Sequence, residues 1–291
     1  MKVFDPLGLE LIQLADSLAP FNIPLIVGGG YGLLLRQQFV EEQGIKTLYA
    51  LPEARATQDL DIFLSLELIA DRGKMIRFRD MLSQCGYQAI EGAKYYQFIR
   101  EMKYVGRTGS IKVDLLAPPP EDPFLRKQMR VDSRRIRSAK HIHAHTTPEA
   151  FPEAFSISDD LIEMSLSSME EKSAKVFLPN TFTYFLLKLF VYRDRRNDKR
   201  TDFGIYHAFD LYRIIAMMTE EDGRIVKKLS ETYADHQVYT EASDILEECF
   251  SKEQSSGSIA ILEHSRRVEA NLTSENIVEF LTDIRTYFLF E

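Results

Sequence analysis

The sequence has no tryptophan, only two cysteines, and no long apolar segment. Cys85 and Cys249 lie far apart, so they match neither the close spacing of a zinc site nor the pairs of a disulfide framework. This use of cysteine is typical of a reducing compartment, and we expect a cytoplasmic protein. A helix that crosses a bilayer needs about 20 apolar residues, and the acidic, amphipathic segment 1–20 does not resemble a signal peptide. We therefore expect no membrane partner.

The sequence also lacks an excess of positive charge. Its formal net charge is −8 and its pI is about 5.4, which argues against a protein that coats nucleic acid without specificity. Hydrophobic residues make up 45% and charged residues 27% of the 291 residues, as in ordinary globular proteins. This length is enough for one large domain or two ordinary ones.

One stretch departs from this acidic average. Residues 126–140 hold seven basic side chains and one acid, Asp132, for a local charge of +6. Such a stretch is either a solvated face or a surface that follows a phosphodiester backbone. The basic residues are Arg126, Lys127, Arg130, Arg134, Arg135, Arg137 and Lys140. The alternating His141, His143 and His145 that follow are interpreted as a polar strand face, with zinc binding as the less favoured reading.

Three consecutive glycines follow a short apolar segment near the N-terminus. Residues 24–27 have the pattern of a buried strand, and YGLLLRQQF after Gly28, Gly29 and Gly30 begins like a helix. A glycine turn lets backbone N–H groups approach a ligand, and a helix N-terminus favours phosphate. The segment matches neither the dinucleotide motif, since Leu33 replaces its last glycine, nor a P-loop. A plain turn is the alternative.

Aspartates on two strand-like segments form the second motif. Asp59 and Asp61 alternate in DLDIFL, so on a strand they point to the same face. Two carboxylates on one face repel each other unless a cation lies between them, and Mg²⁺, or alternatively Mn²⁺, suits oxygen ligands. Asp114 lies in the apolar segment IKVDLL, where a buried carboxylate is costly without a partner. The alternative for the Asp-x-Asp pair is a solvated strand edge.

The polar segment 43–58 between these motifs predicts a loop. Arg55 and Thr57 come just before the aspartate strand. Arg55 is placed to reach a phosphate group, and a surface ion pair is the equally weighted alternative.

A second group of polar residues lies on two predicted helices. Lys188 and Arg195 belong to a helix over 181–196 and lie on one face with Tyr192 between them. Asp210 belongs to the next helix, over 207–218. Because Lys188 is surrounded by apolar residues, it must either reach water or meet an anion. An interhelical salt bridge between Lys188 and Asp210 is the structural alternative.

The remaining periodicity predicts an α+β protein with two domains, residues 1–178 and 179–291. We expect further helices over 7–18, 33–40, 66–85, 225–233, 240–250 and 268–290. Residues 95–102 and 109–116 predict two antiparallel strands, and 157–178 predicts further strands. Residues 251–258 predict a polar loop.

In their order along the chain, the motifs resemble those of a known superfamily. GGGYGLLLR, RATQDLDIFL, KVDLL, LLKLFVYRDRRND and HAFDLYRI are together similar to nucleotidyltransferases with the DNA polymerase beta-like fold, and in particular to the AbiEii/AbiGii toxin-type group. The similarity covers residues 20–220. Residues 37–56 are a departure, since many members have a short gap there. The resemblance implies a mixed β-sheet flanked by helices, followed by a mostly helical C-terminal domain.

The resemblance also implies an activity, which is Mg²⁺-dependent transfer of a nucleoside monophosphate from a nucleoside triphosphate to an acceptor hydroxyl. It implies the 3′ end of tRNA as acceptor, and a toxin that a cognate antitoxin would accompany. Two alternatives stay open: transfer to a small molecule such as an aminoglycoside or to a protein, and a nucleotide-binding module without catalysis. The expected metal ligands are Asp59, Asp61 and Asp114, and the expected catalytic residues add Lys188 and Asp210. The expected nucleotide-binding residues are Gly28, Gly29, Gly30, Arg55, Thr57, Lys188 and Arg195.

Overall fold

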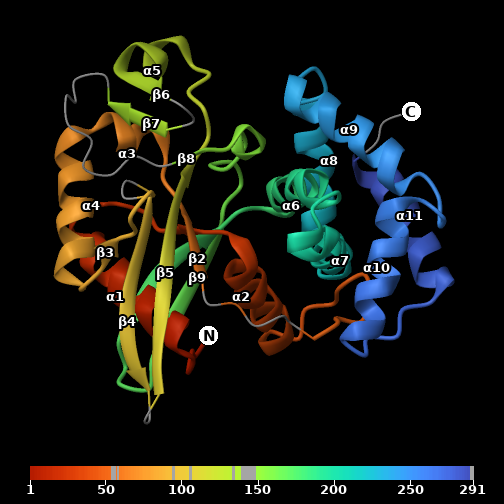
Figure 1. Ribbon diagram of the computed structural model, residues 1–291, viewed down its shortest axis with the longest axis horizontal. Helices are drawn as coiled ribbons and strands as arrows, with labels where there is room; N and C mark the ends of the chain where they lie inside the picture. The colour runs from red at the N-terminus through yellow and green to blue at the C-terminus, as the bar shows by residue number, and fades with distance from the viewer. Residues whose placement is uncertain are drawn as a thin grey trace. The chain divides into compact units, whose positions relative to one another are not determined.

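The computed structural model describes residues 1–53, 57, 59–93, 96–104, 107–132, 135–138 and 149–288. The chain divides into two compact units (Figure 1). The first unit comprises residues 1–39 and 55–179, and the second comprises 40–54 and 180–291. The long segment between the glycines and the first aspartate is thus part of the second unit.

A mixed β-sheet forms the centre of the first unit. Its strand order is β6-β7-β8-β5-β2-β1-β10-β9, and β4 extends it by pairing with β5 and β3. The pairs β2–β5, β1–β10 and β5–β8 are parallel, and the other pairs are antiparallel. The strands are β1 (Ile26–Val27), β2 (Asp59–Phe63), β3 (Gln88–Ala89), β4 (Gln97–Tyr104), β5 (Arg107–Ala117), β6 (Met129–Asp132), β7 (Arg135–Ser138), β8 (Glu149–Ala150), β9 (Ile162–Ser167) and β10 (Ser173–Leu178). The predicted mixed sheet and the antiparallel β4–β5 pair are confirmed.

Helices accompany this sheet along the chain. They are α1 (Pro6–Leu18), α2 (Gly29–Glu42), α3 (Leu66–Ala70), α4 (Arg72–Gln84) and α5 (Pro123–Gln128), with short 3₁₀ turns η1 (Ala19–Phe21) and η2 (Pro152–Ala154). The prediction of a single helix over 66–85 is wrong, because the helix is interrupted at Asp71. This residue has an extended backbone, and its carboxylate accepts the N–H of Lys74 at 3.0 Å, which caps α4.

Alternation along β5 separates an apolar face from a polar one. Val113 and Leu115 are fully buried, whereas Lys112 and Asp114 point the other way and remain partly accessible. Burying a side chain of this size stabilises the fold by about 1.5–3 kcal/mol. The apolar face therefore fixes the strand in the core and leaves the opposite face for polar groups.

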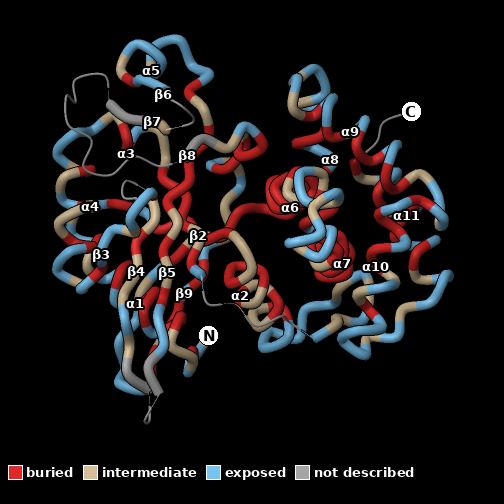
Figure 2. Tube along the Cα trace, in the orientation of Figure 1, coloured by how far each residue is buried: buried red, intermediate tan, exposed pale blue. Residues whose placement is uncertain are grey.

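The second unit is helical, as predicted. Its elements are α6 (Thr181–Arg195), η3 (Lys199–Gly204), α7 (Ile205–Ala216), α8 (Glu220–Thr232), α9 (Gln237–Phe250), α10 (Ser256–Arg267) and α11 (Ser274–Phe288). Helices α6 and α7 are buried along almost their whole length (Figure 2). The polar loop predicted over 251–258 is wrong at its end, since α10 begins at Ser256, and the last helix begins at Ser274, not at Val268.

The segment before the aspartate strand is attached to the second unit by its backbone and by one side chain. The N–H of Leu48 donates to Met218 O at 2.9 Å, and the N–H of Tyr49 donates to Ala216 O at 3.2 Å. The Tyr49 hydroxyl donates to Asp283, and its ring stacks on Tyr212 with centroids 5.8 Å apart. Residues 45–53 contain neither helix nor strand, in agreement with the predicted loop.

In the described part of the chain, every helix is too short or too polar to cross a membrane.

Candidate functional site

Asp61 and Asp114 are direct neighbours on two parallel strands. Their Cα atoms are register partners in the β2–β5 ladder, so both carboxylates leave the same face of the sheet. Asp59 lies two residues earlier on β2, and its own partner on β5 is Lys112. Neighbouring strands are about 4.8 Å apart. The structure therefore brings the three predicted aspartates to one face, although Asp114 lies far from the other two in sequence.

The glycine turn approaches this face from β1 and α2. The N–H of Gly28 donates to the backbone oxygen of Asp61 at 2.8 Å. Gly29 has a φ of +62°, and a Cβ atom built on it would lie 1.7 Å from Oδ2 of Asp61. Only glycine fits both the backbone angle and this contact. The first turn of α2, which includes Gly30, is thereby held against the Asp61 carboxylate.

Asp114 is largely buried on this face. Its side chain is 18% exposed, and its Oδ1 atom is buried without a hydrogen-bond partner in the described residues. Burial raises the pKa of this carboxyl, the Lys112 ammonium partly offsets the rise, and the Asp59 charge adds to it. A carboxylate that is costly to ionise, with one oxygen open, has the properties of a residue that awaits a cation.

Lys112 is a site residue that the sequence analysis missed. Its Nζ atom lies 2.8 Å from Oδ2 of Asp114, and its side chain is 28% exposed. The period of two along a strand would have found it, since Lys112 is two residues before Asp114 in IKVDLL. One ammonium group thus lies on a face with three carboxylates.

The three carboxylates suit a hard divalent cation, but their oxygen atoms do not surround a common position in this structure. Among the described residues, no group of three His, Cys, Asp or Glu side chains is arranged to hold a metal ion. Three aspartates on one face and the open Oδ1 atom of Asp114 nevertheless match the oxygen ligands that Mg²⁺ and Mn²⁺ take. The residues present therefore fit such an ion after a change of side-chain conformation.

Thr57 contacts the backbone at the start of β2, and Arg55 lies outside the described residues. The N–H of Asp59 makes a long contact of 3.4 Å with Oγ1 of Thr57. Thr57 also lines a hollow of about 330 Å³ within the first unit, together with Tyr31 of α2 and Ser110 of β5. The Tyr31 hydroxyl donates to the Asp5 carboxylate at 2.8 Å, which fixes one wall of the hollow. Two of the residues that line this hollow are close in sequence to the site: Tyr31 follows the glycine turn, and Thr57 precedes β2.

The second predicted group forms a buried ion cluster in the second unit. Nζ of Lys188, on α6, lies 2.7 Å from Oδ2 of Asp210, on α7. Nη1 of Arg213 lies 3.2 Å from the other oxygen of Asp210. All three residues are at least 94% buried. Arg213 was missed, although its position three residues after Asp210 places both on one side of the helix.

Arg195 differs from Lys188 in its surroundings. It is exposed near the end of α6, and its Nη1 atom donates to the Tyr206 hydroxyl at 2.9 Å. A buried ion pair is expensive to desolvate and is weak evidence of stability, whereas an exposed arginine keeps its charge available to an anion. The Lys188–Asp210 contact is the predicted interhelical salt bridge.

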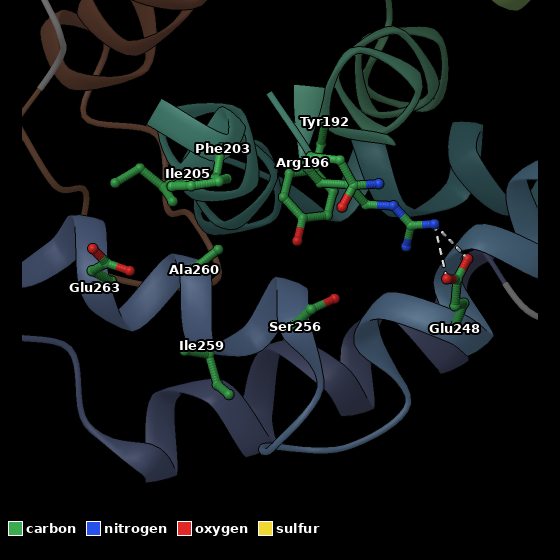
Figure 3. Close-up of a pocket in the computed structure, with 10 residues that line it drawn as sticks. Tyr192, Arg196, Phe203, Ile205, Glu248, Ser256, Ile259, Ala260 and Glu263 are labelled. Atoms are coloured by element: carbon green, nitrogen blue, oxygen red, sulfur yellow. Dashed lines mark hydrogen bonds and ion pairs between the residues drawn. The ribbon is translucent and has the colours of Figure 1, made fainter. Parts of the chain in front are cut away.

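A hollow of about 350 Å³ lies elsewhere in the second unit (Figure 3). Arg196 and Glu248 form an ion pair of 2.8 Å at its side, and Phe203 and Ile259 line it while remaining half-exposed. Asp202 and Phe203 both have positive φ angles, which is uncommon for residues other than glycine. None of the predicted site residues lines this hollow.

The described part of the basic stretch is accessible. Arg126 and Lys127 lie in the last turn of α5, and both are exposed, as is Arg130 on β6. Arg134, Lys140, His141, His143 and His145 lie outside the described residues, so the structure does not bear on the zinc alternative. The accessible arginines suit either a solvated face or contact with phosphates.

Comparisons with known proteins give little beyond this geometry. No protein-family model matches the chain, and no curated protein matches it. One solved structure with some likeness is the solution structure of the antibiotic-resistance factor ANT(2'')-Ia. It shares 10% sequence identity and a TM-score of 0.32, and the alignment covers 79% of this chain and 98% of that one. A TM-score of this size does not establish a shared fold.

Proposed function

We propose that the protein is a nucleotidyltransferase that moves a nucleoside monophosphate from a metal-bound nucleoside triphosphate to an acceptor hydroxyl. The observation that carries the proposal is the pairing of Asp61 with Asp114 across parallel strands, with Gly29 packed against the Asp61 carboxylate. A purely structural role does not account for this pairing. Three acids on one face repel each other, and the buried Asp114 carboxyl favours its neutral form.

Each residue of the carboxylate face has a distinct task in this proposal. Asp59, Asp61 and Asp114 would hold divalent ions, which stabilise the charge that develops on the phosphoryl oxygens. Backbone N–H groups of Gly29 and Gly30 would meet the β- and γ-phosphates at the start of α2, and Gly28, whose N–H donates to Asp61, would hold the turn in place. The hollow beside Thr57 has apolar walls that suit the nucleoside.

The reaction needs one bond to form and one to break. The acceptor oxygen attacks the α-phosphorus, the bond between that phosphorus and the bridging oxygen breaks, and pyrophosphate leaves. Asp114 accepts the proton of the acceptor hydroxyl in this proposal, through the Oδ1 atom that has no hydrogen-bond partner among the described residues. Positioning and charge neutralisation provide most of the catalysis for such a transfer.

The residues of the second unit enter the proposal through their charge. The resemblance in sequence implies that Lys188 and Arg195 contact the triphosphate, and Asp210 would orient Lys188 through the 2.7 Å contact. Arg213, on the other oxygen of Asp210, would help to hold that carboxylate in position. Arg55 remains a predicted phosphate contact.

We infer that RNA is the acceptor, because the basic stretch 126–140 is the main local excess of positive charge in an acidic chain. The resemblance in sequence supports the 3′ end of tRNA and the role of a toxin with a cognate antitoxin. Nucleotide transfer to a small molecule or to a protein is the outcome that would replace this acceptor.

The experiment is transfer of label from each α-³²P nucleoside triphosphate to total RNA in the presence of Mg²⁺ or Mn²⁺. We expect label in RNA of tRNA size, and a loss of about 100-fold or more in Asp61→Asn. Asp16→Asn, on the exposed side of α1, is the matched control and should keep full activity. Label in protein or small molecules would replace the acceptor, and equal transfer by Asp61→Asn would refute the site.

A further inference from the structure

Lys112 is the only basic residue that the β2–β5 ladder places on the carboxylate face, within the residues described for these two strands. It stands opposite Asp59, and its ammonium group lies 2.8 Å from Oδ2 of Asp114. Asp61, the register partner of Asp114, is the next residue of β2 on the same face. The ammonium group therefore carries positive charge into the place where the carboxylates would otherwise share a cation.

We propose that Lys112 is a resident cation that holds Asp114 in the metal-free protein and sets how tightly this face takes a divalent ion. The proposal rests on the function proposed above. It explains why three aspartates share a face and yet no three donors are arranged around a metal position in the described chain. Lys112 attracts one oxygen of Asp114, while the other oxygen is buried and has no hydrogen-bond partner among the residues that the structure describes.

The chemistry of lysine suits this task. Its ammonium is a point charge on a flexible stem, so it can leave one carboxylate for another anion without a change of backbone. The side chain is 28% exposed, which leaves it a path away from Asp114. With a metal-bound triphosphate present, Lys112 would be able to pair with a phosphate oxygen, and Asp114 would be available as a ligand of the metal. The face then takes a metal with its nucleotide more readily than the metal alone.

The test is Mn²⁺ binding to the full chain without nucleotide, followed by electron paramagnetic resonance. Lys112→Met removes the competing charge, and we expect Mn²⁺ affinity to rise by about tenfold, the size of one charge-assisted hydrogen bond. Lys175→Met is the matched control, because Lys175 forms an ion pair of 2.7 Å with Glu163 between β10 and β9. The Mn²⁺ affinity of Lys175→Met should equal that of the wild type. Equal affinity in Lys112→Met, or no Mn²⁺ binding to either protein, overturns the proposal.

A second variant guards against misfolding of the first. Lys112→Arg keeps the charge and offers two parallel hydrogen bonds to a carboxylate, so it should hold Asp114 more firmly and weaken Mn²⁺ binding. Tighter or unchanged binding in this variant contradicts the proposal. A merely structural lysine would shift the melting temperature equally with and without Mn²⁺, whereas here Lys112→Met should gain more from Mn²⁺ than the wild type.

The two proposals fail separately. Tighter Mn²⁺ binding by Lys112→Met without any nucleotide transfer would leave Lys112 as a resident cation and remove the proposed enzyme. Nucleotide transfer by the wild type, together with equal Mn²⁺ affinity of the wild type and Lys112→Met, would support the proposed enzyme and remove the proposed role of Lys112. The Michaelis constant for the triphosphate should rise in Lys112→Met, because the variant loses its phosphate contact.

Discussion

Single residues determine how closely the backbone approaches the carboxylate face, and Gly29 matters most. Gly29→Ala would place a methyl group on Oδ2 of Asp61 and force a side chain into a left-handed backbone. We expect a loss of about 1–2 kcal/mol in unfolding free energy and a loss of Mn²⁺ and nucleotide binding. Denaturant unfolding and nucleotide titration measure the two effects.

Gly44 supplies the control for this prediction. Its φ is +60°, almost the same as that of Gly29, but a Cβ atom there meets nothing within 4 Å. Gly44→Ala should lose a similar stability and keep full nucleotide binding. If both variants lose binding equally, the Asp61 contact is not the cause.

Glu10 offers a test of pH dependence outside the site. It is 2% exposed on α1, and its carboxylate pairs with Arg100 of β4 at 2.5 Å. Burial raises the pKa of Glu10, and the Arg100 charge only partly offsets the rise. The folded state therefore favours the neutral form, so the stability from Glu10 is present below its unfolded pKa and is lost as pH rises through its folded pKa.

Glu10→Gln does not titrate and isolates this effect. The stability of the wild type relative to Glu10→Gln should increase when the pH falls from 7 to 5. Denaturant unfolding at both pH values measures the difference. A difference that stays constant, or that decreases on acidification, would contradict the raised pKa.

At the scale of elements, α6 depends on its N-cap. Asn180 is 1% exposed, and its Oδ1 atom accepts the N–H of Thr183 at 2.9 Å. Asn180→Ala should cost about 1–2 kcal/mol of unfolding free energy, because it leaves a buried donor without its partner. Asp122→Ala, at the exposed N-cap of α5, should cost less, about 0.5 kcal/mol. Equal losses would show that burial of the cap is unimportant.

Periodicity located most elements, because buried helices and strands require regular apolar spacing. It failed where a polar side chain changes the backbone locally. Asp71 ends α3 and caps α4 inside what looks like one amphipathic helix. Ser255 and Ser256 look like part of a polar loop, yet they start α10. Serine favours both loops and helix starts, so the local pattern does not separate the two.

The sequence predicts which acidic residues belong to the candidate site, but it does not predict how those residues are arranged in space. The sequence indicates that Asp59 and Asp61 share a face, since this follows from strand geometry alone. It does not show that β2 and β5 are neighbours or that Asp61 lies opposite Asp114, because pairing depends on the whole sheet. Lys112 and Arg213 escape prediction because a basic residue two or three positions from an acid is common on exposed strands and helices, and only the fold shows that these two contact their acids.

At the scale of the whole molecule, the chain passes between the two units at three places. Residues 40–54 belong to the second unit, where Tyr49 contacts Asp283 and Tyr212. Tyr49→Phe removes a hydrogen bond to a charged acceptor, which is worth about 1.5–3 kcal/mol. We expect faster hydrogen–deuterium exchange in residues 45–53 and little change in the strands of the first unit.

Tyr239→Phe is the comparison for this prediction. Its hydroxyl donates to the backbone oxygen of Phe288 within the same unit. This variant should destabilise the second unit without a specific increase of exchange in 45–53. The same exchange pattern in both variants would show that Tyr49 does not attach the segment.

The central claim is that Asp59, Asp61 and Asp114 form one metal site. The most direct measurement is anomalous scattering from a crystal soaked with Mn²⁺ and a non-hydrolysable nucleoside triphosphate. We predict a peak about 2.0–2.2 Å from carboxylate oxygens of both Asp61 and Asp114, with Lys112 turned away from Asp114. Mn²⁺ bound elsewhere in the protein, with Lys112 still paired to Asp114, would contradict the account.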